Sequence, residues 1–238
     1  MRREKSKYFG YEDRMKKDYE DLERTYREVK GSYSEMIFRL ALVAESKDES
    51  TGAHLVRIAD YSIEIARSLG LPEKDIEIIK YASPMHDIGK IVIPDAILKK
   101  PNGLTPEERE IMKKHTVLGA NLFKGSKDPL LKAAEVICLS HHERFDGTGY
   151  PNGVKGKRIP LFGRIIGIAD VFDALTSKRP YKPAYDFDEA IKRIKRESGK
   201  HFDPEIVEFF LKDSKKIREI WQATKDIEGF ISGKEMLS

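Results

Sequence analysis

The first forty residues carry apolar side chains at every seventh position. From Met15 onward a second apolar set follows the first at a distance of four residues, which is the a and d spacing of a heptad repeat. The first set comprises Tyr8, Met15, Leu22, Val29 and Met36, and the second comprises Tyr19, Tyr26, Tyr33 and Leu40. This spacing predicts a coiled-coil stalk that joins two copies of the chain in a parallel homodimer. The alternative is a single amphipathic helix that lies on its own domain.

After residue 40, apolar positions take the spacing of amphipathic helices, and residues that cap helices separate them. The first stripe consists of Ile58, Tyr61, Ile65 and Leu69. It lies between N-cap candidates at 48–51 and the C-cap candidate Gly70. Further helix starts are expected at Leu71–Glu73, Thr105–Glu108, Asp128–Pro129, Asp188 and Asp203–Pro204. Gly199 should end the helix from Asp188, and the apolar tail after Leu211 predicts one more helix. Because only Ile91–Ile93 has the character of a strand, the pattern predicts an all-α fold.

Histidines stand at or near the ends of several predicted helices. His54 lies in the first turns of its helix, and Pro84 should kink the last turn before His86. A capping box opens the helix that is expected to carry His115 in its interior. The helix that begins at the Asp-Pro pair should run to His141–His142 before it breaks into a glycine-rich loop.

The composition describes a globular chain with a densely charged surface. Its 238 residues are 39% hydrophobic, enough for one large core or for one domain with an appendage. The 44 basic and 40 acidic side chains leave a net charge of +4, which does not argue for nucleic-acid or membrane binding. The single cysteine, Cys138, excludes an internal disulfide, and no apolar run reaches transmembrane length or resembles a signal peptide. We therefore expect a cytoplasmic protein without membrane insertion.

Five of the six histidines fall near predicted helix ends or inward faces, together with two aspartates. The histidines are His54, His86, His115, His141 and His142, and the aspartates are Asp87 and Asp170. Any one of these histidines could be a core or helix-terminal residue, but the seven together predict a metal site. Imidazole and carboxylate ligands without thiolates favour iron or manganese over a structural zinc site. Cys138 is expected in the core, and His201 stands apart from the group.

The pair His86–Asp87 places an imidazole nitrogen and a carboxylate at one helix end. This arrangement can hold one metal ion and bridge to a second. Gly89 and Lys90 follow directly, where they should end the helix and direct a cation to the same place. Alone the pair is weak evidence of a metal site, because His-Asp dipeptides are common and mostly solvated. Its significance comes from the other ligands.

The order of these motifs resembles the HD-GYP branch of the HD-domain phosphohydrolases. The resemblance rests on His54, His86–Asp87, His115, His141–His142, Gly149–Tyr150–Pro151 and Asp170. It extends from about Leu40 to about Leu211, and the stretches 83–90, 142–151 and 169–176 also read like the family. The resemblance implies an HD-domain helical bundle. Family members are metal-dependent phosphodiesterases that degrade the bacterial second messenger cyclic di-GMP, and some act on related cyclic dinucleotides.

The resemblance also implies a role for each ligand. Asp87 would bridge two divalent metal ions. One coordination sphere would be completed by His54, His86 and Asp170, and the other by His115, His141 and His142. A hydroxide placed between the two metals would then attack phosphorus in line with the leaving group.

Substrate contacts are implied at four positions. Lys90 would neutralise the charge that grows on the phosphoryl oxygens. Arg179 and Lys182 resemble family residues that hold the substrate phosphates, and the alternative is that both are surface cations. Tyr150 would present its ring from a loop that glycine permits, for stacking or for a partner surface, and otherwise it packs the loop.

The chain departs from part of the family at a third metal site. Some members hold a third metal with a glutamate one helical turn before the first histidine, where this chain has Ser50. Glu49 is adjacent, but a fifth position back on a helix is rotated by a further ~100°. We therefore expect two metal ions per chain, Fe or Mn, and do not favour a third metal held by Glu49.

Two classes of function are open. The favoured one is a phosphodiesterase that converts cyclic di-GMP to linear pGpG, with further cleavage to GMP, because every ligand position is filled. The alternative is a signalling module that binds a cyclic dinucleotide or a diguanylate cyclase (GGDEF) partner through the 149–151 loop with little turnover. A nucleotide phosphomonoesterase would explain the His-Asp site but not the loop. We expect a coiled coil over 1–40, a catalytic domain over 41–211 and a helical tail over 212–238.

Overall fold

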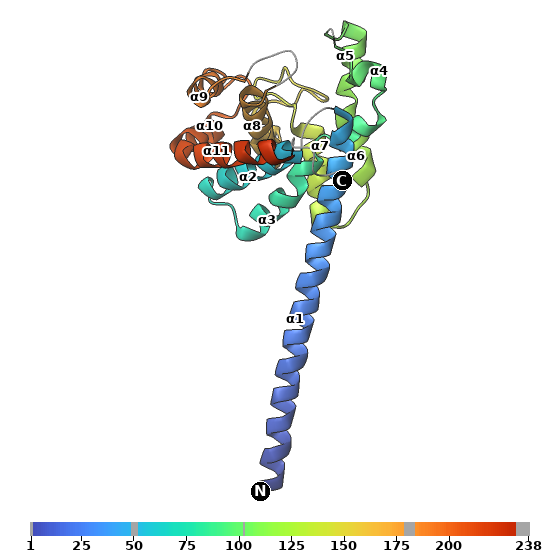
Figure 1. The fold of residues 1–238 in the computed structure, drawn as a ribbon, viewed down its shortest axis with the longest axis vertical. Coiled ribbons are helices and arrows are strands. Elements are labelled where there is room, and N and C mark those ends of the chain that lie inside the picture. Colours follow the sequence, from blue (N-terminus) through green and yellow to red (C-terminus); the bar gives the residue numbers. More distant parts are fainter. Residues whose placement is uncertain (1, 49–51, 102, 179–183, 232–238) are drawn as a thin grey trace. The chain divides into compact units, whose positions relative to one another are not determined.

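The described part of the chain folds into helices without a β-strand. The computed structural model describes residues 2–48, 52–101, 103–178 and 184–231. The α-helices are, in order, α1 (Arg2–Glu45), α2 (Gly52–Ser68), α3 (Glu73–Ala82), α4 (Asp95–Leu98), α5 (Pro106–Lys113), α6 (His115–Phe123), α7 (Pro129–Ser140), α8 (Leu161–Thr176), α9 (Phe187–Arg196), α10 (Pro204–Lys212) and α11 (Ser214–Ile231) (Figure 1). The 3-10 helices are η1 (Ser46–Asp48), η2 (Ser83–Met85), η3 (Ile88–Val92) and η4 (Gly156–Arg158). The predicted all-α fold is confirmed.

α1 is the long N-terminal helix that the heptad pattern predicted. The chain divides into two compact units, Met1–Arg39 and Leu40–Ser238, and α1 runs through the boundary. Seven a and d side chains of the first unit have exposed fractions from 39% to 68%: Met15, Tyr19, Leu22, Tyr26, Val29, Tyr33 and Met36. Leu40 and Val43 continue the same spacing in the second unit and are also exposed. The side chain of Tyr8 lies outside the described residues.

The core of the second unit forms between α2 and α8, and α10 packs against both helices. Tyr61 of α2 meets Phe172 of α8 with ring centroids 5.2 Å apart, and Phe172 meets Phe210 of α10 at 5.1 Å. All three side chains are buried. Burying one such apolar side chain stabilises a fold by about 1.5–3 kcal/mol. This packing fixes α2 against α8, the helices that carry His54 and Asp170.

η3 lies against α6 with almost no space between their backbones. A Cβ atom added at Gly89 would stand 2.0 Å from the His115 carbonyl oxygen and 2.5 Å from the Gly119 nitrogen. Cys138 of α7 is buried beneath Gly119, and its thiol donates a hydrogen bond to the Met85 carbonyl at 3.2 Å. The close approach brings the η3 turn onto the first turn of α6, and Cys138 occupies the core as predicted.

Most of the predicted helix boundaries are confirmed. Gly70 follows α2 with a φ of 73°, which suits a C-cap glycine, and the capping box at Thr105 has both of its hydrogen bonds. Asp128 and Asp203 cap α7 and α10 by accepting hydrogen bonds from the backbone of the following turn. Of the N-cap candidates at 48–51, the last three lie outside the described residues.

The strand predicted at Ile91–Ile93 was wrong, because most of this stretch belongs to η3. The amide of Lys90 donates to the Asp87 carbonyl at 2.9 Å, and the amide of Ile93 donates to the Lys90 carbonyl at 3.0 Å. These bonds span three residues, as in a 3-10 helix. An apolar β-branched run forms a strand only beside a partner strand, and the described residues offer none.

The boundaries of α9 differ from the prediction by a few residues. The N-cap is Asp186, which accepts a hydrogen bond from the Glu189 amide at 2.8 Å, and not Asp188. Asp188 lies within the first turn and pairs with Arg218 of α11. The helix ends before Gly199, which has a φ of 76° in the turn that follows.

His115 opens a helix of its own, whereas the prediction placed it inside the helix from Thr105. α5 ends at Lys113, and α6 starts at His115. The His115 ring donates from Nδ1 to the Met112 carbonyl, and the Thr116 hydroxyl donates to the Lys113 carbonyl, both at 2.8 Å. These side chains occupy carbonyls in the last turn of α5, so the chain can turn without leaving those groups unpaired.

The apolar residues after Leu211 form α11, as predicted, and this helix packs against α2 and α10. Ile217 and Thr224 are buried on its inner face. The side chain of Ile227 lies outside the described residues. Among the described helices, none has both the length and the apolar character that crossing a bilayer requires.

Candidate metal centre

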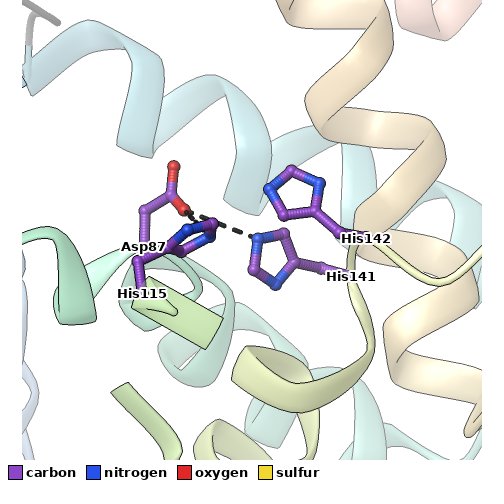
Figure 2. Close-up of side chains that lie close together, drawn as sticks. All are labelled: Asp87, His115, His141 and His142. Carbon is purple, nitrogen blue, oxygen red and sulfur yellow. Dashed lines mark ion pairs between the residues drawn. The ribbon is translucent and has the colours of Figure 1, made fainter. Parts of the chain in front are cut away.

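Seven predicted ligands gather in the second unit in two adjoining groups, each with ligand atoms within 4.8 Å of one another. The first site consists of His54, His86 and Asp170. The second site consists of Asp87, His115, His141 and His142 (Figure 2). His142 and Asp170 are half-buried, and the other five are buried. Because His86 and Asp87 are neighbours in the chain, the two sites share one turn of backbone.

Helix ends deliver several of these side chains. His115 is the first residue of α6, and His141 is the C-cap residue of α7. α3 ends at Ala82, and Pro84 lies in the η2 turn that follows, directly before His86. Proline lacks the amide that would continue the α-helix, so the chain leaves its helical path here. The predicted kink is confirmed.

Three histidine rings are oriented by main-chain carbonyls of their own turn. The distances from Nδ1 to the carbonyl oxygen are 2.9 Å for His86 and Ser83, 2.8 Å for His115 and Met112, and 3.0 Å for His141 and Ile137. A carbonyl oxygen only accepts, so each Nδ1 carries a hydrogen. In the neutral rings, the lone pair therefore lies on Nε2, which faces the other ligands.

The central ligand atoms have no hydrogen-bond partner among the described residues. They are Nε2 of His86, His115 and His141 and Oδ1 of Asp87, and all are buried. The three nitrogens lie 3.1 to 3.5 Å from the Asp87 carboxylate, close enough for ion pairs but without hydrogen-bond geometry. An unsatisfied buried group costs about 1–3 kcal/mol. A divalent cation that accepts these lone pairs removes the cost, so the residues fit a metal centre.

The carboxylates of the centre favour positive charge. Burial alone would lower the pKa of His86, but Asp87, Asp170 and Glu45 raise it to about 9. Burial alone would raise the pKa of Asp87, but Lys90 and His86 hold it well below its ordinary value. Asp87 is therefore ionised, and a bound cation would supply the charge that a proton on His86 otherwise provides.

Two rings of the second site, those of His141 and His142, are kept neutral by their surroundings. Burial lowers the pKa of His141, and burial together with His141 holds the pKa of His142 well below its ordinary value. Neutral imidazoles keep the lone pairs that metal binding needs. Tyr150 packs on His142 with ring centroids 4.8 Å apart, and Lys113 Nζ lies 5.4 Å from the centroid of the Tyr150 ring. Tyr150 thus covers one side of the second site.

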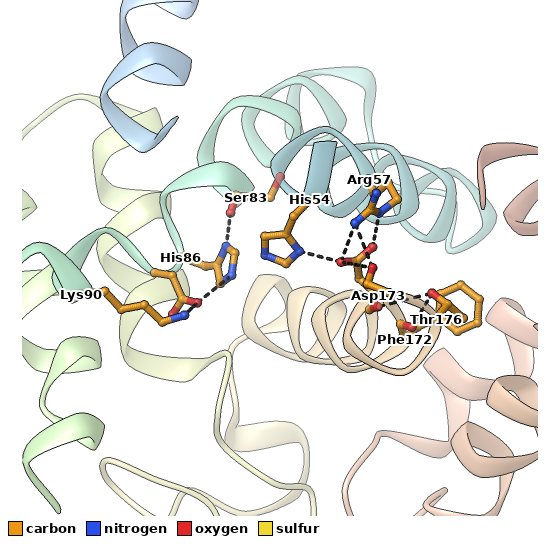
Figure 3. Close-up of polar contacts among 10 residues, drawn as sticks. His54, Arg57, Ser83, His86, Lys90, Phe172, Asp173 and Thr176 are labelled. Carbon is orange, nitrogen blue, oxygen red and sulfur yellow. Dashed lines mark hydrogen bonds and ion pairs between the residues drawn. The ribbon is translucent and has the colours of Figure 1, made fainter. Parts of the chain in front are cut away.

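A side chain from another helix orients His54 (Figure 3). Its Nδ1 lies 2.7 Å from Oδ2 of Asp173. Arg57 binds the same carboxylate through Nε and through Nη2, which lies 3.2 Å from Oδ2. Burial alone would raise the pKa of Asp173, but His54 and Arg57 lower it, so Asp173 is ionised. Since a carboxylate accepts, Nδ1 of His54 donates and Nε2 is left as the ligand atom.

Lys90 reaches the centre, as the sequence predicted. Its Nζ lies 2.7 Å from Oδ2 of Asp87, and its side chain is partly buried. The ammonium group therefore stands beside the carboxylate that both ligand groups approach (Figure 3).

A buried glutamate ties down the loop that carries Tyr150. Glu143 accepts hydrogen bonds from the amides of Asn152 at 2.8 Å and Val154 at 3.0 Å. The peptide bond between Tyr150 and Pro151 is cis. These two hydrogen bonds to one carboxylate fix the loop on both sides of Gly153. The Tyr150 ring is therefore held over the second site.

Sequence reasoning missed three residues that hold the candidate site in place: Asp173, Arg57 and Glu143. Asp173 follows Asp170 by three positions and Arg57 follows His54 by three, so each lies on the same helix face as a ligand. That spacing could have found both. Glu143 follows the histidine pair directly, but nothing in its spacing indicates that it binds loop amides nine and eleven residues later.

Four other predicted positions, Arg179, Lys182, Glu49 and Ser50, lie outside the described residues. His201 stands apart from both ligand groups, as expected, and stacks on Phe202 with ring centroids 4.3 Å apart.

Comparison with known proteins matches residues 40–206 to the HD domain family. A cyclic di-GMP phosphodiesterase of Thermotoga maritima is 43% identical over 221 residues, which cover 91% of this chain and 60% of that protein. The 3'3'-cGAMP-specific phosphodiesterase 2 of Vibrio cholerae is 42% identical over 184 residues, which cover 77% of this chain and 35% of that protein. The chain thus spans only part of the length of these relatives.

A solved structure shows the same fold. The crystal structure of a cyclic GMP-AMP-specific phosphodiesterase of V. cholerae matches with a TM-score of 0.59 at 22% identity, over 81% of this chain and 53% of that chain. At this identity the likeness concerns the fold alone. Because the family match covers most of the chain and includes all seven predicted ligand positions, this protein belongs to the HD domain family.

Proposed function

We propose that this chain is a metal-dependent phosphodiesterase that hydrolyses cyclic di-GMP. The observation that carries the proposal is the convergence of buried imidazole nitrogens on the carboxylate of Asp87, with the first site beginning at the adjacent His86. The T. maritima relative, named a cyclic di-GMP phosphodiesterase, supports the substrate class because its similarity extends over 91% of this chain.

The proposal includes two divalent cations per chain, Fe or Mn. They would be held by His54, His86 and Asp170 in the first site and by His115, His141 and His142 in the second, with Asp87 shared. Imidazole and carboxylate donors without a thiolate suit these metals. When bound, such a pair supplies Lewis acidity to the phosphate and to an attacking water.

The chain's own residues would bind the substrate and offset its charge. In the reaction, a water oxygen bonds to phosphorus, the bond from phosphorus to one ribose 3′ oxygen breaks, and that oxygen takes up a proton. Lys90, 2.7 Å from Asp87, is placed to offset negative charge on the phosphoryl oxygens. Tyr150 offers an aromatic face beside His142 for a guanine base. Arg179 and Lys182 are proposed to hold the substrate phosphates.

Product analysis tests this function. The full chain is loaded anaerobically with Mn(II) or Fe(II) and incubated with cyclic di-GMP, and the products are separated by chromatography. We expect linear pGpG, with GMP as a later product after a second hydrolysis. Parallel reactions with 3'3'-cGAMP test the substrate of the V. cholerae relative, since turnover of that nucleotide alone would overturn the cyclic di-GMP assignment.

A chain that binds two metals but releases no product would instead favour the signalling module. In that case the loop with Tyr150 would bind a cyclic dinucleotide or a diguanylate cyclase (GGDEF) partner. A binding measurement with cyclic di-GMP on the same metal-loaded sample separates these two outcomes.

We propose two metals and not three. The described residues contain two groups of three or more ligand atoms close enough to hold an ion. Some members of the HD-GYP branch that this chain resembles hold a third metal with a glutamate, and this chain has Ser50 at that position, whose neutral hydroxyl is a poorer ligand than a carboxylate. Anaerobic metal analysis should therefore give close to two ions per chain. A value near three that falls to two in Glu49→Ala would contradict the proposal.

We further propose a parallel homodimer through α1 and a cytoplasmic setting. The exposed a and d side chains from Met15 to Val43 supply a long apolar seam, and a second copy of the same helix would cover it. The proposed parts of the chain are the coiled coil over 1–40, the catalytic domain over 41–211 and the helical tail over 212–238.

A further inference from the structure

We propose that Asp173 is a positioning residue that strengthens metal binding at the first site and makes the two sites unequal in affinity. Asp173 does not belong to either ligand group. It acts through the ring of His54. Oδ2 of Asp173 accepts a hydrogen bond from Nδ1 of this ring at 2.7 Å. The inference rests on the metal pair of the proposed function and not on the identity of the substrate.

The partners of the histidine rings differ in charge. His86, His115 and His141 donate from Nδ1 to neutral main-chain carbonyls. His54 donates to the carboxylate of Asp173, which is also paired with Arg57. A negative partner at Nδ1 increases the electron density at Nε2 and makes it a stronger metal ligand. Among the histidine rings whose Nδ1 partner is described, only His54, in the first site, has a carboxylate as that partner.

The carboxylate of Asp173 is held from several directions, so it cannot turn away from His54 (Figure 3). Arg57 binds both carboxylate oxygens, and Ser177 Oγ lies 3.3 Å from Oδ2 of Asp173 and 2.9 Å from Nη2 of Arg57. Asp173 is 1% exposed and Arg57 is 5% exposed. A buried group held in this way fixes the plane of the imidazole and leaves Nε2 directed to the first site.

Helix α8 supplies both a ligand and the positioning residue. Asp170 and Asp173 are three residues apart and lie on one face of α8, while His54 and Arg57 are three residues apart on one face of α2. Each helix therefore contributes one candidate ligand of the first site, and Asp173 of α8 also contacts the ring of His54 on α2. Since Arg57 balances the charge of Asp173, the carboxylate acts on the metal through His54 and not as a second free negative charge.

The test measures metal binding to the full chain after its metal is removed. Mn(II) is titrated into the protein, and the free ion is followed by electron paramagnetic resonance. In Asp173→Asn we expect the affinity for one of two Mn(II) ions to fall about 10- to 100-fold. The affinity for the other ion should stay as in the unmodified chain.

Two backgrounds assign the effect to a site. His115→Ala removes a ligand of the second site, and His54→Ala removes one of the first. Adding Asp173→Asn should weaken Mn(II) binding in the His115→Ala chain and leave it unchanged in the His54→Ala chain. An equal effect in both backgrounds would show that Asp173 acts on the whole fold and would overturn the inference.

Two controls separate positioning from stability. Asp173→Asn leaves Arg57 buried without its charge partner, so the combined Arg57→Gln and Asp173→Asn variant restores neutrality. Recovery of full Mn(II) affinity in the combined variant would overturn the inference, and continued weak binding at one site supports it. Asp203→Asn removes another buried carboxylate bound to an arginine, Arg164, and should keep both Mn(II) affinities.

The same titration distinguishes the inference from the proposed function. If the unmodified chain binds fewer than two Mn(II) ions, the metal pair itself is refuted. If it binds two, and Asp173→Asn binds two with unchanged affinities, only the role of Asp173 is refuted.

Discussion

Replacing Gly89 by alanine should force η3 away from α6 and disturb both candidate metal sites. The added Cβ would lie 2.0 Å from the His115 carbonyl oxygen and 2.5 Å from the Gly119 nitrogen, where an ordinary contact begins at 3.4 Å. Both neighbours are backbone atoms, so no side chain can rotate away to relieve the overlap. Overpacking costs about 1–3 kcal/mol where side chains can adjust, and we expect a loss of about 3 kcal/mol or more here.

Urea unfolding followed by circular dichroism measures this loss, and Gly103→Ala is the matched control. A Cβ at Gly103 would meet no atom within 4 Å, so the control should unfold like the original chain. Mn(II) binding should also weaken in Gly89→Ala, because the displaced turn carries Asp87 and the helix it touches carries His115. An unfolding free energy within about 1 kcal/mol of the original, with two Mn(II) ions bound, would refute the reasoning.

Four further outcomes are expected. Asp87→Ala should reduce cyclic di-GMP hydrolysis to near background while circular dichroism stays close to native, since the shared ligand is lost; retained turnover would refute the bimetallic proposal. Arg179→Ala should raise KM at unchanged metal content, because a charged contact to phosphate contributes about 1.5–3 kcal/mol, and unchanged kinetics would make Arg179 a surface cation. Light scattering of the full chain at micromolar concentration should give the mass of a dimer, and a dimer that survives deletion of residues 1–35 would move the interface to the rest of the chain. Burial and Arg144 lower the pKa of His201 from 6.5 to about 4, so the unfolded chain binds the proton more tightly. The resulting stability, up to about 3 kcal/mol, should be complete above pH 6.5 and lost as the pH falls toward 4. Urea unfolding at several pH values measures this change in the free energy of unfolding. In His201→Asn, the free energy of unfolding should no longer depend on pH over this range, and a dependence that persists would mean that another group titrates.

The clustering of the candidate ligands could be predicted from the sequence because local features fix where these residues lie. Pro84 ends the α-helical path before His86, and Asp128 starts a helix whose length places His141 at its end. Such features act within a few residues of chain, so one sequence displays them. The resemblance to the HD-GYP branch then supplied the grouping that periodicity alone does not contain.

Contacts between segments that are far apart in the sequence could not be predicted from such local features. His54 and Asp173 are separated by 119 residues, and their hydrogen bond depends on how α2 packs on α8. The break before His115 depends on side chains that bond to carbonyls behind them, which helix propensity does not report. Likewise, the apolar run at Ile91–Ile93 suits a strand or a tight turn, and only the surrounding backbone decides between them.

The main-chain carbonyls behind His86, His115 and His141 make these three ligands independent of side-chain identity at the positions that orient them. Each ring uses an oxygen three or four residues earlier in its own turn, and every amino acid supplies that oxygen. Substitutions at Ser83 or Met112 can therefore change packing while the ring keeps its acceptor. A helix end with a histidine at this spacing is a self-contained unit that protein designers could move between helical scaffolds, whereas His54 would have to be transferred together with its partner helix.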